Sequence, residues 1–293
     1  METGSSRFVG EGGDEFEIHR PRLRALAYRM LGSLAEADDA VQETWLRVAR
    51  ADASEVVNPA GWLTTITARV CLDALRRRAA RPEEPFGMRL PDPVLTAPDG
   101  IDPEHEVLLA DAVGLALLVV LDTLTPAERL AFVLHDTLGV PFDDIGRLVG
   151  RSPNAAAQLA SRARRRIRDA AVTPDVDLAR QWKVANAFLA AARAGDFSAL
   201  VDVLAPDAVL RADIGSPAEL HGADAIAPQV LSYARMAPFA RRVLVNGAVG
   251  FVPMPGGQPF AVIALTVRDD RVTAIDIIAD PDRLAGLEVP AEL

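Results

Sequence analysis

Apolar residues recur at steps of three and four through most of the first 80 residues, and this spacing places them on one face of a helix. The segment SLAEADDAVQETWLRVAR carries the stripe at Leu34, Ala37, Val41, Trp45 and Val48. The segment before it stops at Gly32, and Ser33 stands where a helix cap is expected. A third segment opens with Asn58 as cap and Pro59 at the first helical position. The pattern predicts a helical domain over residues 14–80.

Proline, glycine and acidic residues replace this pattern over residues 81–103. The segment RPEEPFGMRLPDPVLTAPDGIDP contains six prolines, which favours a linker. Helical periodicity returns over residues 104–171. There Thr125, Pro126 and Glu128 have the spacing of a capping box at the start of a helix that runs to Gly139. These residues predict a second all-α domain.

The end of this second domain has two chemically different faces. PFDDIGRLVG predicts a short helix that stops at Gly150, and Ser152 caps the next helix, SPNAAAQLASRARRRIRD. At about 100° per residue, one half of that helix carries Ala156, Leu159, Ala160, Ala163 and Ile167. The opposite side carries Asn154, Gln158, Ser161, Arg162, Arg165 and Arg168. One face is suited to packing and the other to polar contacts.

Residues 177–293 begin with two helical segments and continue with strand-like runs. The runs are AVLRADI, RRVLVNGAVGFVP, QPFAVIALTVRDD and RVTAIDIIAD. The last two predict a hairpin that turns at Asp269 and Asp270. Helices followed by several antiparallel strands indicate an α+β domain. The chain as a whole therefore predicts two all-α domains followed by one α+β domain.

Composition narrows the class of protein. The 293 residues are 50% hydrophobic, which suits folded domains. No run of 18 apolar residues occurs and the N-terminal segment is polar, so we expect neither a transmembrane helix nor a secretory signal. Cys71 is the only cysteine, which excludes an internal disulfide and favours the cytoplasm. Four scattered histidines show no metal-ligand spacing, and we expect no metal and no other cofactor.

Charge is distributed unevenly along a chain whose formal net charge is −10. Residues 82–144 have a local balance of −11, whereas residues 145–168 carry seven arginines and no acid. A basic segment beside an acidic one indicates a face that binds a polyanion. The same charges also suit a helix face that is simply solvated, so charge alone leaves both interpretations open.

The arrangement of helices favours binding to DNA. A short helix, a three-residue turn and a second helix with a polar face form a helix-turn-helix, whose second helix lies in the DNA major groove. Asn and Gln side chains can pair with adenine and Arg with guanine, while arginines farther along the helix contact phosphate. The small residues Ala155, Ala156 and Ala157 permit close approach to the groove.

Several motifs of the chain resemble bacterial sigma factors of the extracytoplasmic-function (ECF) group. They are AEADDAVQETWLRV, GWLTTITARVCLDALRRR and LTPAERLAFVLHDTLGVPFDDIGRLVGRSPNAAAQLASRARRRI. Their order is that of the family's σ2 domain, linker and σ4 domain, over about residues 14–171. Residues 177–293 resemble the SnoaL-like fold, a cone-shaped α+β domain with a curved antiparallel sheet that is attached to one ECF subgroup.

Three short motifs bear on the subgroup. RLPDP in the linker and DPDRL near the C-terminus approximate two of its motifs. A DGGG-type motif expected after the first strand of the α+β domain is absent, and ADIGSP stands there over residues 212–217. We therefore carry over no function that is tied to the DGGG-type motif.

The resemblance implies a protein that directs core RNA polymerase to specific promoters and has no catalytic activity of its own. It assigns the −35 element to the helix-turn-helix, with contacts from Arg151, Ser152, Asn154, Ala155, Gln158, Ser161, Arg162 and Arg165. It assigns the opened −10 strand to the helix that begins at Pro59, with contacts from Asn58, Thr64, Thr65, Arg69, Arg76 and Arg77. Arg78 extends this cluster toward phosphate, and Arg69 stands where many relatives carry asparagine.

The resemblance also implies contacts with core polymerase, at the clamp helices of β′ and at the β flap. The residues expected at the β′ clamp are Asp38, Asp39, Gln42, Glu43 and Trp45. Two tryptophans have a second interpretation. Trp45 lies on the apolar stripe, so it could pack in the core instead of contacting polymerase. Trp62 lies at helical spacing from Ile66, so it could pack in the core instead of stacking on a base.

The α+β domain has three alternative roles: catalysis, ligand sensing, or a clasp that contacts the linker and fixes the spacing of the first two domains. SnoaL-like cyclases and isomerases use an Asp or a His for proton transfer, and the candidates here are Asp213, His221, Tyr233 and Asp276. We expect His221 in a loop. We favour the clasp. The rival functions for the whole chain are a cyclase, isomerase or small-ligand sensor fused to a DNA-binding module, and a simple helix-turn-helix repressor.

Overall fold

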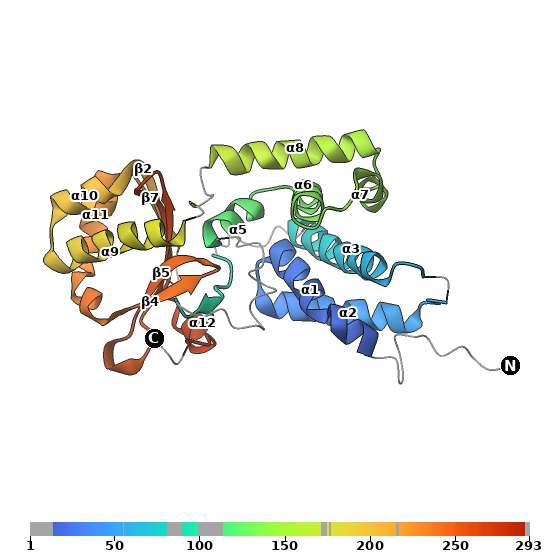
Figure 1. The fold of residues 1–293 in the computed structure, drawn as a ribbon, viewed down its shortest axis with the longest axis horizontal. Helices are drawn as coiled ribbons and strands as arrows, with labels where there is room; N and C mark the ends of the chain where they lie inside the picture. Colours follow the sequence, from blue (N-terminus) through green and yellow to red (C-terminus); the bar gives the residue numbers. More distant parts are fainter. Residues whose placement is uncertain are drawn as a thin grey trace. The chain divides into compact units, whose positions relative to one another are not determined.

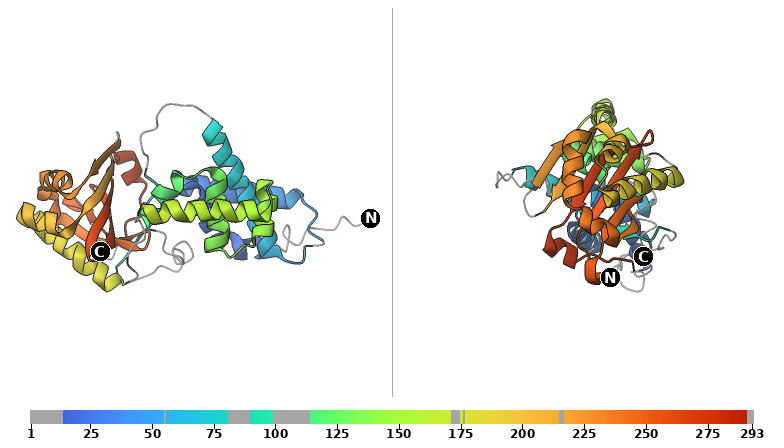
Figure 2. Two further views of the ribbon diagram at one scale, coloured as in Figure 1. Left: turned by 90° about the horizontal axis from the view of Figure 1, so that it is seen from above. Right: turned by 90° about the vertical axis from the view of Figure 1, so that its left-hand side faces the viewer.

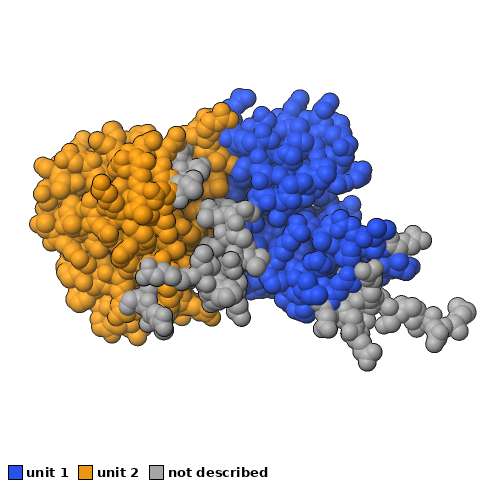
Figure 3. Space-filling model, in the orientation of Figure 1, with its two compact units in different colours: residues 1–83, 106–111, 121–166 blue, residues 84–105, 112–120, 167–293 orange. Residues whose placement is uncertain are grey.

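The computed structural model describes residues 14–54, 56–80, 90–98, 114–170, 175, 177–214 and 217–290. They fall into two compact units (Figure 3). The helical unit comprises residues 1–83, 106–111 and 121–166, and the sheet unit comprises residues 84–105, 112–120 and 167–293. Helix α5 (Leu115–Asp122) spans the boundary between them. The predicted domain limits at residues 81, 103–104 and 171 lie outside the described residues.

The first part of the helical unit consists of α1 (Asp14–Leu31), α2 (Leu34–Arg50) and α3 (Pro59–Ala80), as Figure 1 shows. They pack around the buried residues Phe16, Leu23, Val41, Val48, Ala53 and Leu63. Gly32 ends α1 with a φ of 75°, which confirms it as a helix stop. Ser33 is the N-cap residue of α2, but its side chain makes no capping hydrogen bond. The predicted position of the cap is therefore confirmed, but the side-chain hydrogen bond typical of a serine cap is not formed.

The second part consists of α6 (Pro126–Phe132), the π-helical turn η1 (Val133–Thr137), α7 (Phe142–Val149) and α8 (Pro153–Asp169). The capping box of Thr125 and Glu128 is formed, as predicted. The sequence predicted one regular helix as far as Gly139, whereas α6 widens into η1 after Phe132. The wider turn brings Nδ1 of His135 to 3.0 Å from the Val140 carbonyl oxygen and stacks its ring on Phe142.

The turn between α7 and α8 depends on two glycines. Gly150 ends α7 with a φ of 67°. A Cβ atom at Gly146 would lie 2.7 Å from the carbonyl oxygen of Arg151, so only glycine fits where the two helices approach. Ser152 then accepts a hydrogen bond from the backbone N–H of Ala155 at 3.3 Å and caps α8 as predicted.

The sheet unit is an α+β domain, as predicted. Its strands are β1 (Leu95–Thr96), β2 (Leu204–Asp213), β3 (Pro217–His221), β4 (Ala240–Val245), β5 (Ala248–Pro253), β6 (Val262–Arg268) and β7 (Arg271–Ile278). They lie in the order β1-β4-β5-β6-β7-β2-β3, and neighbours are antiparallel except for β2 and β7. The predicted hairpin of β6 and β7 is confirmed. Its turn residues Asp269 and Asp270 have φ values of 51° and 60°, as a tight hairpin turn requires.

Helices cover one face of this sheet. They are α9 (Leu178–Ala194), α10 (Phe197–Val203) and α11 (Ala223–Ser232), followed by the 3-10 turn η2 (Ala234–Phe239). Figures 1 and 2 show α9 running along the sheet. Trp182, Phe188, Leu210, Phe251 and Ile275 are among the residues buried between the two layers. The turn η3 (Pro255–Gly257) and helix α12 (Pro281–Ala285) complete the unit.

Among the described residues, no helix combines the length and apolar character that crossing a membrane requires.

Candidate nucleic-acid interface

Helix α8 presents the two faces that its sequence predicts. Ala156, Leu159, Ala160, Ala163 and Ile167 are all buried. Of the residues expected at the −35 element, Ala155 is half-buried and the others are exposed: Arg151, Ser152, Asn154, Gln158, Ser161, Arg162 and Arg165. The polar side chains are therefore free of the packed interior, as contact with a DNA groove requires.

Acidic side chains of the helical unit hold three of the arginines on α8. Arg162 donates from Nε to Oε1 of Glu128 at 2.9 Å, and Nη1 of Arg166 lies 3.5 Å from Oε2 of the same carboxylate. Arg164 pairs through Nε with Asp136 at 2.9 Å. The positive charge of this helix is thus partly neutralised, and several of its side chains are held in place, by neighbouring residues.

Glu128 connects α8 to the start of α6. Its Oε2 accepts hydrogen bonds from the backbone N–H of Thr125 at 3.2 Å and from the Thr125 hydroxyl at 2.8 Å. Only 5% of the residue is exposed. Burial raises the pKa of Glu128, but the combined effect of the hydrogen bonds from Thr125 and Arg162 is larger and lowers it. The pKa therefore lies below its ordinary value, and the carboxyl group keeps its charge.

Helix α3 carries the residues expected at the −10 strand. The Asn58 side chain caps the helix, since Oδ1 accepts from the N–H of Gly61 at 3.0 Å. The hydroxyls of Thr64 and Thr65 donate to backbone carbonyls one turn earlier, at 2.7 Å and 2.9 Å. Thr64 is buried and Thr65 half-buried. Their hydroxyl oxygens are left as acceptors rather than donors.

The arginines of α3 divide into two groups. Arg69, Arg76 and Arg77 are exposed, as phosphate contact requires. Arg78 instead forms an ion pair with the carboxylate of Glu36 and donates to the Leu31 carbonyl at 3.4 Å. Arg78 therefore ties the end of α3 to the turn between α1 and α2, a role that its place in the arginine run does not reveal.

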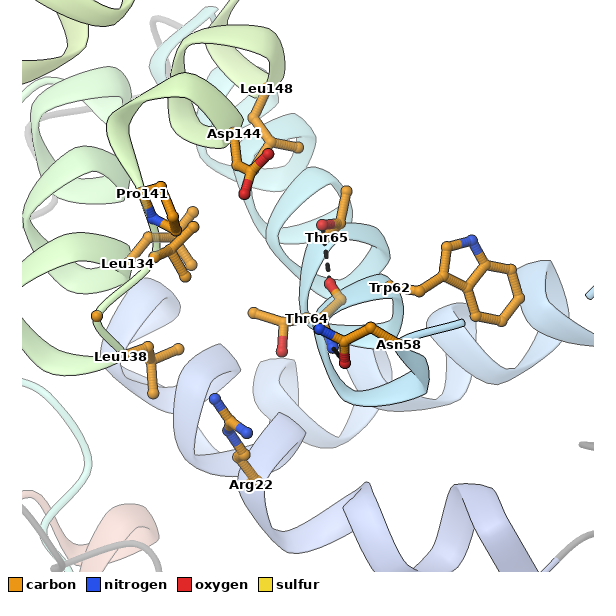
Figure 4. Close-up of a pocket in the computed structure, with 13 residues that line it drawn as sticks. Arg22, Asn58, Trp62, Thr64, Thr65, Leu134, Leu138, Pro141, Asp144 and Leu148 are labelled. Carbon is orange, nitrogen blue, oxygen red and sulfur yellow. Dashed lines mark hydrogen bonds between the residues drawn. The ribbon is translucent and has the colours of Figure 1, made fainter. Parts of the chain in front are cut away.

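A pocket of about 380 Å³ lies between the two parts of the helical unit (Figure 4). One wall carries Arg22, Asn58, Gly61, Trp62, Thr64 and Thr65. The other wall carries Leu134, Leu138, Gly139, Val140, Pro141, Asp144 and Leu148. In Figure 4 the indole of Trp62 is directed away from Leu138 and Pro141. Three residues expected at the −10 strand therefore face η1 and α7 in this arrangement.

The α2 residues expected at polymerase form an acidic surface. Asp38, Asp39 and Gln42 are exposed, and Glu43 is half-buried. Asp38 pairs with Arg24 at 2.6 Å, and Glu43 pairs with Arg47 at 2.8 Å. These pairs are at the surface and hold little energy, so a basic partner can replace them.

Both tryptophans of the helical unit pack at the edge of its core. Trp45 meets the edge of the Phe16 ring at a centroid distance of 5.0 Å. Trp62 is half-buried and packs against the same core. The geometry agrees with the packing interpretation of each, while the exposed part of each ring leaves an edge for a partner.

Arg129 makes a contact between helices that the sequence did not predict. Only 2% of it is exposed. It pairs through Nη1 with Asp122, and it donates from Nε and Nη2 to the backbone carbonyl of Arg29 at 3.1 Å and 3.0 Å. The single sequence signal was a lone arginine next to Leu130 and Ala131 on a helix. This guanidinium connects α6 to α1.

The linker adds a strand to the sheet unit. Strand β1 pairs with β4, and beside it Val94 exchanges hydrogen bonds with Asn246, at 3.1 Å to Oδ1 and 2.8 Å from its backbone N–H. Arg283 donates from Nη2 to the Pro91 carbonyl and to Asp92, each at 3.0 Å. Asp92 belongs to the RLPDP motif and Arg283 to DPDRL, so the two motifs meet.

Three of the four candidate residues in the α+β domain share one face of the sheet, opposite the helices. Asp213 and Asp276 lie on β2 and β7, and Asp213 forms an ion pair with Arg283. His221 is the last residue of β3, not part of a loop as expected, because β2 continues far enough to pair with it. His221 is exposed and lies 2.8 Å from Glu219. Tyr233 follows α11 and lies 6.5 Å from the ring of Phe260.

Asp276 is buried beside an arginine. It is 1% exposed and pairs with Nη1 of Arg211 at 2.8 Å. Burial raises the pKa of Asp276 to about 6, against the opposing effect of Arg211. No group of three or more His, Cys, Asp or Glu side chains suited to a metal ion occurs in the described part of the chain.

Comparison with protein families matches two regions of the chain. Residues 16–81 match the model for sigma-70 region 2, and residues 114–167 match the model for sigma-70 region 4. These matches fall on α1–α3 and on α5–α8.

Individual relatives match almost the whole chain. The ECF RNA polymerase sigma factor SigJ of Mycobacterium tuberculosis is 38% identical over 93% of this chain and 93% of its own length. The probable ECF sigma factor SigI of the same species is 33% identical over 93% of this chain and 94% of its length. The crystal structure of SigJ superposes with a TM-score of 0.77 at 34% identity, covering 95% of this chain and all of that one.

Proposed function

This chain belongs to the extracytoplasmic-function (ECF) RNA polymerase sigma factors, and we propose how its elements divide the work of promoter recognition. As a sigma factor it binds core RNA polymerase and directs it to promoter DNA. We assign the −35 element and the β flap to the domain of residues 104–171, and the −10 element and the β′ clamp helices to the domain of residues 14–80. Core polymerase resides in the cytoplasm, which is therefore the proposed compartment.

The exposed polar face of α8 supports the first assignment. Gln158, Arg162 and Arg165 project from a helix whose opposite side is buried, and the Gly146 contact fixes the turn before it. The exposed Arg69, Arg76 and Arg77 on α3 support the second assignment. Their attraction to phosphate should fall steeply with salt concentration.

The observation that carries the proposal is the docking of α6 on α1 through the buried Arg129. By their names the two promoter elements lie about 25 base pairs apart, which is on the order of 85 Å of duplex. Helices α3 and α6 are in direct contact, and α8 spans only about 25 Å at 1.5 Å per residue. The docked helical unit is too short to reach both elements, so the sigma factor must open when it binds a promoter.

The sheet unit supplies a means of regulating this opening. The linker that joins the two DNA-binding domains is held as strand β1 and by Arg283. A linker fixed in this way restricts how the domains separate, so release of it shifts the population toward the open form. We propose that the SnoaL-like domain regulates activity through this clasp.

The test compares Arg283→Gln with Arg268→Gln in run-off transcription with core polymerase on a library of promoters. Arg283→Gln removes the bonds to Asp92 and Pro91 together with the ion pair to Asp213, whereas Arg268→Gln removes a surface pair with Asp269 at the hairpin turn. The clasp predicts more transcript and tighter promoter binding for Arg283→Gln alone. Activity and promoter affinity equal to those of the control reject the clasp and leave the domain assignments standing.

A further inference from the structure

The Arg162 guanidinium is held at one end and free at the other. Its Nε donates to Oε1 of Glu128 at 2.9 Å, and the side chain remains 52% exposed. In the part of the chain that the structure describes, no hydrogen bond engages its Nη1 or Nη2. The four N–H groups of these two atoms form the fork that matches a phosphate or the edge of a guanine.

Glu128 is itself fixed before any DNA arrives. One carboxylate oxygen, Oε2, closes the capping box with Thr125, and the other oxygen receives Arg162. The residue is 5% exposed, so it has little freedom to move and cannot reach DNA in place of the arginine. A carboxylate locked by a helix cap is a rigid support for a long and otherwise mobile side chain.

We infer that Glu128 is a positioning residue for −35 recognition, which orders Arg162 so that its terminal nitrogens meet the promoter. The inference rests on the proposed role of α8. An arginine that is ordered in advance loses less conformational entropy when it binds, which is worth about a two- to tenfold gain in affinity for the right sequence. The gain belongs to sequence-specific binding, because non-specific phosphate contact needs charge and not a fixed orientation.

Glu128 should therefore strengthen sequence-specific binding and weaken non-specific binding. Its negative charge lies beside the DNA-binding helix and weakens attraction to any phosphate. Glu128→Gln keeps the capping box, in which Glu and Gln are equivalent, and removes the charge-assisted bond to Arg162. We therefore expect weaker discrimination at the −35 element together with stronger non-specific binding.

Asp136 provides the matched control. It pairs with Arg164 on the same helix at 2.9 Å, and Arg164 is not among the residues proposed to contact DNA. Asp136→Asn removes the same amount of negative charge and frees one arginine. It should raise non-specific binding as much as Glu128→Gln does and leave −35 discrimination as it was.

The experiment selects promoters from a library with a randomised −35 element, using holoenzyme made from the full-length sigma factor. Sequence discrimination and affinity for unrelated DNA are measured for wild type, Glu128→Gln, Asp136→Asn, Arg162→Gln and the double variant Glu128→Gln/Arg162→Gln. We expect Glu128→Gln to lose about two- to tenfold in discrimination. We expect the double variant to be no worse than Arg162→Gln, because Glu128 acts through Arg162.

The outcomes separate the inference from the function on which it rests. If Arg162→Gln relaxes discrimination and Glu128→Gln does not, the role of Glu128 is overturned and α8 remains the −35 reader. If neither does, the proposed contact of Arg162 falls as well. A parallel loss of specific and non-specific binding in Glu128→Gln also overturns the inference, because it indicates a merely structural role.

Discussion

Arg129 and Arg29, one hundred residues apart in the sequence, are joined by two hydrogen bonds from the buried Arg129 guanidinium to the Arg29 backbone carbonyl. Burial lowers the pKa of Arg129, and the charge of Asp122 acts against that effect. A guanidinium that has left water needs all of its partners, so this contact is formed completely or not at all. It suits a junction that is either docked or open.

Removing the guanidinium should open the helical unit. Arg129→Leu leaves the Arg29 carbonyl and Asp122 without their partner, which costs about 1–3 kcal/mol of docking free energy. The population of the open form should rise roughly five- to 150-fold. Energy transfer between dyes attached at Arg50→Cys on α2 and Asp143→Cys on α7 measures this opening, because the transfer efficiency falls as the two dyes move apart.

The control for this variant is Arg20→Leu, which breaks an exposed ion pair with Glu17 on α1. Transfer efficiency should not change there. Equal transfer in Arg129→Leu and the wild type would show that the two parts of the helical unit are held by something other than Arg129.

Cys71 should be silent toward thiol reagents in the folded protein. It is fully buried, and burial raises the pKa of its thiol to about 12, so almost no thiolate exists at pH 8. A colorimetric disulfide reagent should react only after denaturant is added. Rapid reaction of the native protein at pH 8 would mean that α3 leaves its core far more often than its packing implies.

Gly146 should tolerate no side chain. A Cβ there meets the backbone of Arg151, which cannot yield cheaply, and we expect Gly146→Ala to cost about 1–3 kcal/mol and to weaken binding to the −35 element. At Gly61 the nearest atom is the flexible Asn58 side chain, at 2.8 Å. Gly61→Ala should therefore cost much less in urea unfolding. Equal losses in the two variants would refute the close approach of α7 and α8.

Asp276 should make the sheet unit less stable as pH rises from about 4 to 6. Its pKa is about 6 in the fold against 3.8 for an ordinary aspartate, so the native state binds the extra proton in this range. The stability that protonation supplies is complete below pH 4 and lost by about pH 6, and it amounts to up to about 3 kcal/mol.

This effect is isolated by subtraction. Trp182 reports on the sheet unit alone once Trp45→Phe and Trp62→Phe are introduced, since the chain has three tryptophans. The difference in unfolding free energy between that protein and its Asp276→Asn derivative should change between pH 4 and 6 and be constant above. If this difference does not change with pH, Asp276 does not take up the proton, and the prediction is wrong.

Much of the helical unit follows from local sequence signals. The stops at Gly32 and Gly150 and the capping box of Thr125 each depend on a few neighbouring residues, so they could be predicted. The two faces of α8 follow from helical periodicity in the same way. The π-helical turn after Phe132 could not be predicted, because it goes with contacts of His135 with Val140 and Phe142 that only the folded chain shows.

The contacts that matter most for regulation lie beyond the reach of periodicity. Arg129, Arg162 and Arg283 are ordinary arginines in the sequence, and each acquires its role from a partner far along the chain. The linker offered no strand signal, because β1 is short and exists only where β4 pairs with it. Such pairings are decided by tertiary structure and not by local preference.

The most direct test of the account measures the same dye pair, at Arg50→Cys and Asp143→Cys, in the free sigma factor and in holoenzyme bound to a selected promoter. Opening predicts high transfer in the free protein and a separation larger by tens of ångströms in the promoter complex, because −35 and −10 DNA are occupied at once. High transfer retained in a complex that still makes transcript would contradict it, since the docked unit would then be the active form.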